Sequence, residues 1–247
     1  MGRVKIAKKS TFIDMTAMSD VTVLLLTFFM LTSTFLNKEP ATVITPPSVS
    51  EEKVQETNYI QVLVNPDGKV WLTLHGDTSQ NFSTEKMRIA LLDEVTNLYN
   101  ERYPSANLSF NDQQKLTFSK LNTFGVPLKQ LGDFLNLSIN NRQTGMTEQD
   151  KWLDGSDGNK NHISGIPVSW NQDEDRLNEF QMWMKAARMA SNDAGAPLYD
   201  AIKDGTGVAL KADQNTSFEV VHMVMDNLQT IKMNKFTLLT ALKEGGE

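Results

Sequence analysis

The longest apolar run of the chain lies near its N-terminus, VTVLLLTFFMLTSTFL from Val21 to Leu36. Counted back to Phe12, the segment covers residues 12–36, and a helix that crosses a membrane needs about 20 residues. Each strongly apolar residue favours insertion by about 0.3–0.6 kcal/mol, while one charged aspartate at the helix centre costs about 2.5–3.5 kcal/mol. Ten such residues outweigh one aspartate, so we expect a transmembrane helix over residues 12–36.

One face of this segment is polar. Asp20 lies at the entrance of the apolar run, Thr27 and Thr34 follow it at intervals of seven residues, and Thr16 precedes it by one turn. A heptad spacing keeps side chains on one helix face with about 20° of drift per heptad. An ionisable group at membrane depth is costly and typically marks ion or proton movement. We therefore interpret this face as one side of a hydrated path or as a partner-facing surface. The alternative is that the threonine hydroxyls bond only to their own backbone.

Charge predicts the orientation. Four basic residues precede the helix (Arg3, Lys5, Lys8 and Lys9), whereas Lys38 alone follows it closely. The positive-inside rule places the N-terminus in the cytoplasm and residues 37–247 across the membrane, which in a bacterium is the periplasm. A cleaved signal peptide is the main alternative, but an aspartate at the entrance of the apolar region and no clear cleavage motif after it favour an uncleaved anchor.

Composition excludes several classes of protein. The chain has 247 residues, a net charge of −6 and no cysteine. The length suits one membrane helix with one or two modest domains. An acidic domain argues against nucleic-acid binding, and the lack of cysteine excludes thiol catalysis, disulfides and Cys-ligated zinc.

The rest of the chain predicts an α+β domain. Residues 37–58 are rich in Pro, Thr, Ser and Glu and are predicted to form a linker. The segments YIQVLV and KVWLTL then flank the turn NPDG and predict a hairpin. Residues 84–100 have apolar residues at helical spacing, with Ser83 or Thr84 as the cap. GVALKAD and KFTLLTAL are predicted strands on either side of a helix with a Thr216/Glu219 capping box. Such a β-α-β unit indicates a small sheet with helices on one face.

The predicted organisation is a basic tail (1–11), a transmembrane helix (12–36), the linker and a domain (59–247) with an insert at about 104–205. Within the insert, LKQLGDFLNL and RLNEFQMWMKAARMA favour helices, and residues 140–175 resemble a long loop.

No catalytic or metal-binding motif is present. The three histidines, His75, His162 and His222, are far apart in sequence and lack metal-ligand spacing. The stretch DGSDGNKN at 154–161 fails the calcium-loop template, because an apolar residue falls at a ligand position. Nucleotide-binding loops and nucleophile motifs are also missing. We therefore expect a binding or assembly module with no metal and no cofactor, not an enzyme.

Three segments together point to a family. FIDMTAMSDVTVLLLTFFMLTSTF closely resembles the membrane helix of the ExbD/TolR family, with Thr16 and Asp20 at matching positions and Ala17 where the family usually has proline. TPPS (45–48) is similar to the family's short strand after the membrane, and residues 206–242 resemble its C-terminal strand–helix–strand, including Asp213 at the turn. FGVPLKQLGDFLNL resembles a segment of elongated members.

The resemblance implies a subunit of a bacterial inner-membrane proton-channel motor. Asp20 would be the proton carrier, with protons as the coupling ion. The partners would be a multi-helix ring of the ExbB/TolQ type around a homodimer of these helices, and a TonB-like energy transducer. The strong similarity covers residues 1–48 and 206–242.

Three alternatives remain open. A TolR-like subunit would act with a TolA-type partner in envelope integrity. A membrane-anchored periplasmic binding protein would need no energy coupling, so Asp20 would be replaceable by a neutral residue. A flagellar-type stator would need a peptidoglycan-binding domain, for which we find no motif.

Overall fold

The computed structural model describes residues 15–32, 39–48, 55, 57–76, 83–137 and 147–242. The chain forms two separate units, Met1–Lys38 and Glu39–Glu247, and each is described by itself.

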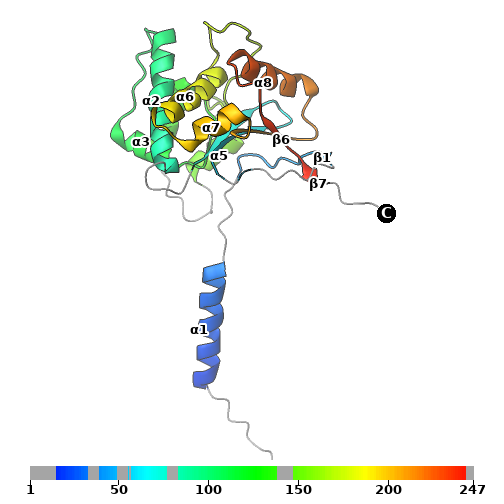
Figure 1. The fold of residues 1–247 in the computed structure, drawn as a ribbon. Coiled ribbons are helices and arrows are strands. Elements are labelled where there is room, and N and C mark those ends of the chain that lie inside the picture. Colours follow the sequence, from blue (N-terminus) through cyan, green and yellow to red (C-terminus); the bar gives the residue numbers. More distant parts are fainter. Residues whose placement is uncertain are drawn as a thin grey trace, which may run out of the picture. The chain divides into compact units, whose positions relative to one another are not determined.

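The first unit contains helix α1, Met15–Thr32 (Figure 1). It has 18 residues with a mean hydropathy of 1.6, and it is the one helix in the described part of the chain that is long and apolar enough to cross a membrane. At 1.5 Å per residue such a helix is about 27 Å long, close to the thickness of a hydrocarbon core. None of its residues is buried, so its apolar surface is available to lipid or to other helices. The outer ends of the predicted span, 12–14 and 33–36, lie outside the described residues.

The second unit is built on a five-stranded sheet in the order β4-β3-β2-β5-β6. Its strands are β2 (Tyr59–Val64), β3 (Val70–His75), β4 (Thr123–Phe124), β5 (Val208–Ala212) and β6 (Thr237–Leu239). The predicted hairpin is confirmed as the antiparallel pair β2–β3. Its turn is closed by the Asn65 side chain, which accepts a hydrogen bond from the Lys69 N–H at 2.8 Å, and Gly68 adopts the left-handed φ of +77° that favours glycine there.

Seven helices of the second unit are described: α2 (Thr84–Arg102), α3 (Asp112–Ser119), α4 (Leu128–Asn136), α5 (Glu148–Asp154), α6 (Glu179–Asp193), α7 (Pro197–Asp204) and α8 (Phe218–Thr230). The predicted cap of the first is confirmed, because the Ser83 hydroxyl accepts from the Lys86 N–H at 3.4 Å. The expectation of a continuous loop over 140–175 is wrong. Helix α5 forms there because Thr147 and Asp150 make a reciprocal capping box and Trp152 and Leu153 are buried.

Strand pairing defines the sheet face that carries the main core. Val62, Leu72, Phe124 and Leu210 lie on one face by register. The Phe124 ring lies 4.9 Å from that of Phe118 on α3 and 4.8 Å from that of Trp183 on α6. These helices therefore pack on this face, as the α+β prediction requires, and residues 104–205 supply a strand and much of the apolar core.

The C-terminal part confirms the predicted β-α-β unit, with β5 and β6 parallel on either side of α8 in the sequence. Val224 and Leu228 of its helix are fully buried. The predicted Thr216/Glu219 capping box is wrong: the N-cap is Ser217, without a side-chain cap hydrogen bond. The helix begins one residue later than that motif requires, and the Thr216 hydroxyl is buried without a partner among the described residues.

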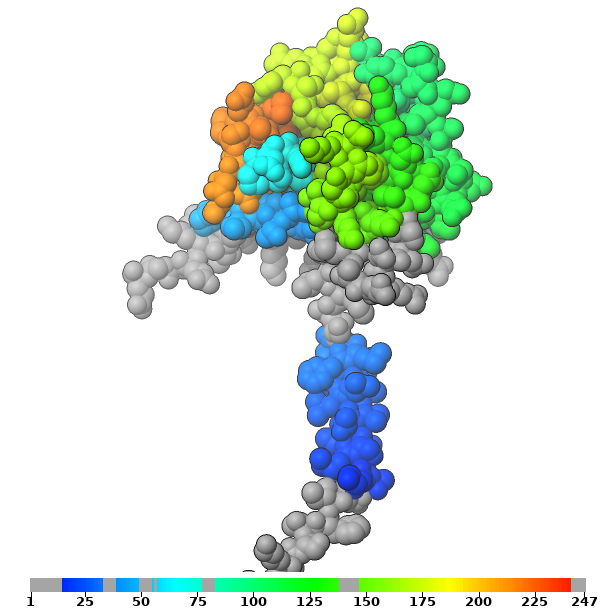
Figure 2. All heavy atoms as spheres, turned by 180° about the vertical axis from the view of Figure 1, so that it is seen from behind, coloured from blue at the N-terminus to red at the C-terminus, as the bar shows by residue number. Residues whose placement is uncertain are grey.

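The predicted last strand is divided in two. Residues 237–239 form β6 at the edge of the main sheet, whereas Ala241–Leu242 form β7, which pairs in parallel with β1 (Pro47–Ser48) in a separate two-stranded sheet. The short strand expected at 45–48 is thereby confirmed. Figure 2 shows residues 39–48, in blue, at the surface of the folded unit beside the segment around Asp213, in orange.

Candidate functional site

Asp20 lies in the second turn of α1, among apolar residues that are exposed along the whole helix. Thr16, Ser19 and Asp20 lie next to one another on the surface of this helix. Thr27 shares the face of Asp20 by its heptad spacing. Thr34, the last member of the predicted polar face, lies outside the described residues. Ser19 is an additional polar residue beside Asp20 that the heptad pattern did not single out.

Four hydroxyl groups of α1 donate hydrogen bonds to backbone carbonyls of the same helix. Thr27 donates to the Leu24 carbonyl at 2.9 Å, and Ser19 donates to the Thr16 carbonyl at 2.9 Å. Thr22 and Thr32 make equivalent bonds one turn back at 2.8 Å. Such local bonds let hydroxyls remain in hydrocarbon at little cost. Among the described residues, Asp20 has no hydrogen bond or ion pair of this kind.

Residues 39–44, the first described residues of the folded unit, are bound to β5 and to the turn that follows it. Ile44 donates its backbone N–H to Asp213 Oδ2 at 2.8 Å and accepts from the Gln214 N–H at 2.8 Å. Glu39 forms an ion pair with Lys211 at 2.7 Å. Asp213 also accepts from the Asn215 N–H at 2.8 Å. This hydrogen bond, and then that from Ile44, hold the pKa of Asp213 below its usual value. The first described residues after the membrane helix are thus fixed to the β5–α8 turn.

A second group of polar residues contains the buried Arg88 and the partly buried Tyr59 and His75. The Arg88 guanidinium donates to the carbonyls of Ser119 at 3.0 Å and Leu74 at 3.2 Å, and burial lowers its pKa to about 10. His75 stacks on Tyr59 with ring centroids 4.3 Å apart. Burial, and then the nearby Arg88 charge, lower the pKa of His75. No group of residues suited to hold a metal ion occurs in the described ranges.

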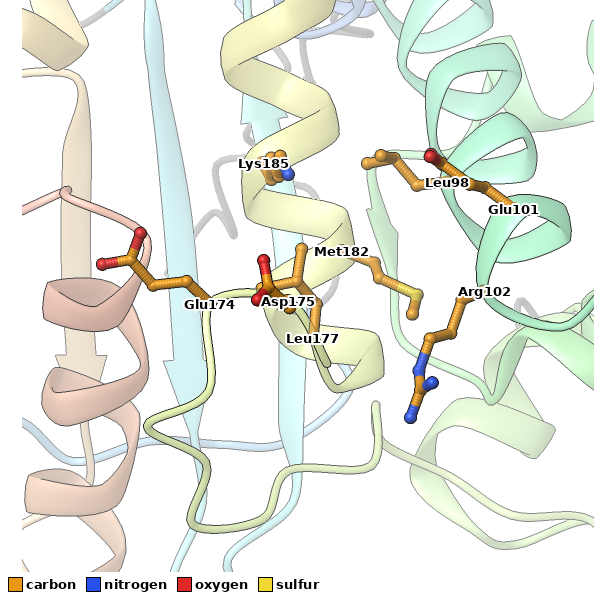
Figure 3. Close-up of a pocket in the computed structure, with 8 residues that line it drawn as sticks. All are labelled: Leu98, Glu101, Arg102, Glu174, Asp175, Leu177, Met182 and Lys185. Carbon is orange, nitrogen blue, oxygen red and sulfur yellow. The ribbon is translucent and has the colours of Figure 1, made fainter.

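The folded unit has a hollow of about 390 Å³ between α2, α6 and the loop before α6 (Figure 3). Its lining mixes charges of both signs: Glu101 and Arg102 come from α2, Glu174 and Asp175 from the loop, and Lys185 from α6. A nucleophile with an adjacent base is missing from this lining. The arrangement therefore provides no basis for acyl or phosphoryl transfer.

An apolar helix with an internal aspartate, joined to a small α+β domain, is the arrangement of a membrane-anchored protein with one spanning helix. The chain matches the family model of the biopolymer transport protein ExbD/TolR over residues 7–243, nearly its whole length, and it belongs to this family. The resemblance predicted from the sequence is confirmed. No curated protein and no solved structure matches the chain.

Membership of the ExbD/TolR family indicates the general role of the protein. Proteins of this family are membrane-anchored, non-enzymatic subunits that couple energy to biopolymer transport, and they generally work with ExbB/TolQ-type and TonB/TolA-type partners. The matched range also spans residues 104–205, and their assignment as an insert stays a prediction.

Proposed function

We propose that this protein is an ExbD-like subunit of an inner-membrane motor that uses the proton motive force to energise a TonB-type protein for outer-membrane transport. The observation that carries the proposal is Asp20, an ionisable side chain within the span of α1 and in line with Thr27. A carboxylate can accept and release a proton. One elementary charge crossing 100 mV releases about 2.3 kcal/mol, which is the energy source of the proposed motor.

The proposed assembly is a homodimer of α1 helices inside a multi-helix ring of the ExbB/TolQ type. The ring supplies polar groups opposite each Asp20, since the described chain offers none. The folded units pair through the edge of the main sheet. Strand β7 is already paired with β1, so the edge that residues 235–242 can offer is that of β6, where Leu238 is 52% exposed. An unpaired edge is a ready template for another strand.

The proposed orientation places the N-terminus in the cytoplasm and the folded unit in the periplasm, because basic residues gather before α1. A reporter that works only in the periplasm, fused after Glu247, should be active. The same position should be silent with a reporter that works only in the cytoplasm. The reverse pattern would refute this orientation.

The central test replaces Asp20. Asp20→Asn preserves the size and hydrogen-bonding capacity of the side chain but cannot carry a proton. In cells that depend on this copy, we expect normal membrane levels and normal association with the ring subunit, but no energised uptake. Full uptake in Asp20→Asn cells would eliminate the proton-carrier role and favour a membrane-anchored binding protein without energy coupling.

Threonines of the same helix provide matched variants. Thr27→Val removes a hydroxyl on the Asp20 face, whereas Thr22→Val and Thr32→Val remove hydroxyls that make the same type of backbone bond on other faces. We expect Thr27→Val to lower uptake by roughly threefold, the equivalent of a polar contact of about 0.6 kcal/mol between membrane helices. The two other variants should retain full uptake.

The second candidate is a TolR-like role with a TolA-type partner in envelope integrity, which the family also includes. The two roles differ in what the Asp20→Asn cells lose. Loss of uptake with an intact envelope supports the TonB-type role, and detergent sensitivity with normal uptake supports the TolA-type role. Identification of the proteins that co-purify after gentle solubilisation provides an independent answer.

A further inference from the structure

The folded unit contains a second hollow, of about 350 Å³, whose charged lining residues are all basic. Arg188 comes from α6, Lys203 from α7, and Lys232 and Lys235 from the segment between α8 and β6. Aspartate and glutamate are missing from its lining, although the protein has a net charge of −6. Four cations from three separate parts of the chain therefore converge in an otherwise acidic molecule. We call this hollow the basic pocket.

Local geometry brings three of these residues to the pocket. Arg188 Nη1 donates to the Ile231 carbonyl at 2.8 Å. Lys232 has a φ of +63°, a left-handed conformation that usually belongs to glycine at the end of a helix. Gly205, at a φ of +98°, lies so close to Lys235 that an added Cβ would be 2.6 Å from the Lys235 Cβ. The absence of a side chain at 205 thus allows Lys235 to approach the pocket.

Few of the described carboxylates lie close enough to neutralise the four positive charges of the basic pocket. Lys232 pairs with Glu174 at 3.1 Å, but both side chains are largely exposed, and such pairs contribute little. In the described part of the chain, Arg188, Lys203 and Lys235 have no carboxylate within ion-pair distance. Helices α7 and α8 both end beside the pocket, and the negative ends of their dipoles favour cations there. The dipoles favour the four cations without adding a carboxylate, so the site keeps its net positive charge.

We propose that the basic pocket binds a compact oxyanion with at least two negative charges, namely the phosphate group of a small organic phosphate or of a lipid headgroup. Lysine ammonium groups and a planar arginine guanidinium are the usual protein groups for phosphate. The volume is at the small end of ligand sites, which run from about 300 to 1,000 Å³. Buried Ile202 and Met233 give the pocket an apolar floor for an organic part of the ligand.

The test uses the full chain in nanodiscs of phosphatidylcholine, with inorganic pyrophosphate as the probe in calorimetry at constant ionic strength. We expect saturable binding at one site per chain. The double variant Lys203→Gln/Lys235→Gln should weaken this affinity by about tenfold, because two nearby cations are lost. The charge-retaining pair Lys203→Arg/Lys235→Arg should bind as the wild type does, which separates lost charge from lost folding.

Lys120 and Lys160 are matched controls, since both are exposed lysines outside the pocket. Lys120→Gln/Lys160→Gln changes the net charge by the same amount and should leave the affinity unchanged. An equal loss in this control, or no saturable binding by the wild type, would overturn the proposal. Nanodiscs that contain phosphatidylglycerol distinguish the source of the phosphate. A lower apparent pyrophosphate affinity in them supports a headgroup ligand, and an unchanged affinity supports a soluble one.

Discussion

Asp213 accepts a hydrogen bond from the backbone N–H of Ile44 at 2.8 Å, across 169 positions of sequence. The same carboxylate accepts from the Asn215 N–H through its other oxygen at 2.8 Å. One side chain thus closes the β5–α8 turn and fixes the segment that follows the membrane helix in the sequence.

Replacement of Asp213 should release that segment. In Asp213→Asn one of the two acceptor oxygens becomes a donor, so one of the two backbone N–H groups loses its partner. We expect a lower midpoint of urea unfolding and faster proteolysis near residues 39–48. Asn215→Ala is the control, because it removes only the weaker 3.1 Å side-chain bond to Asp213 and leaves Ile44 in place. Equal effects of the two variants would contradict a special role for the Ile44 contact.

The lowered pKa of Asp213 gives this contribution a defined pH dependence. An aspartate with a depressed pKa in the folded state stabilises that state above its unfolded pKa of about 3.9, and the stabilisation disappears as the pH falls through the folded value. The difference in unfolding midpoint between the wild type and Asp213→Asn should therefore be constant from neutral pH to about pH 5 and shrink below about pH 4. A difference that stays constant below pH 4 would argue against a lowered pKa of Asp213 in the folded protein.

Trp183 should be one of the most costly residues to remove. It is 1% exposed and its ring contacts those of Phe118 and Phe124. We expect Trp183→Ala to lower the free energy of unfolding by about 3–5 kcal/mol, as for other large core aromatics. Trp170→Ala is the matched control, since Trp170 is 48% exposed, and it should cost below about 1 kcal/mol. Equal effects would contradict a core that joins α6 to the sheet.

This core shows what the sequence could predict and what it could not. The hairpin at 59–75 and the helix beginning after Ser83 were predicted correctly, because each follows from a pattern of apolar and turn-forming residues within one continuous stretch of sequence. Strand β4 has two residues, too few for any periodicity. Its place at the sheet edge depends on pairing with β3 and on packing against Trp183, and both of these partners are distant in sequence. The division of residues 235–242 into β6 and β7 depends likewise on a partner, β1, at residues 47–48.

The functional residues likewise include some that the sequence could reveal and some that only the structure could reveal. Asp20 was evident from the sequence because one carboxylate in an apolar run is a local signal. The contact between Ile44 and Asp213 could not be foreseen from local pattern, and only the family resemblance pointed to Asp213. The basic pocket combines residues of three segments between 188 and 235. None of its lysines stands out in sequence, because surface lysines are common.

His75 should make the folded unit sensitive to mild acid. Burial, and then the Arg88 charge, lower its pKa in the folded state, whereas an unfolded histidine titrates at about 6.5. The unfolded state therefore binds more protons as the pH falls below about 6.5, and stability declines with it. His75→Gln should reduce this decline between about pH 7.5 and pH 5, measured as the urea midpoint. His222→Gln alters an exposed histidine and should retain the wild-type dependence.

The last prediction concerns the pairing of the membrane helices. The chain has no cysteine, so single substitutions give unambiguous disulfide cross-links. If the Asp20 face is turned toward the ring, the two α1 helices of a homodimer meet through the opposite face, where Leu25 and Phe29 lie at 100° per residue. In membranes that contain the ring subunit, Leu25→Cys and Phe29→Cys should form dimers upon oxidation more efficiently than Thr27→Cys. The reverse order would place the polar face between the two helices. Only monomers at every position from Val21 to Leu31 would exclude a paired arrangement, because adjacent parallel helices must bring some position of that range within disulfide distance.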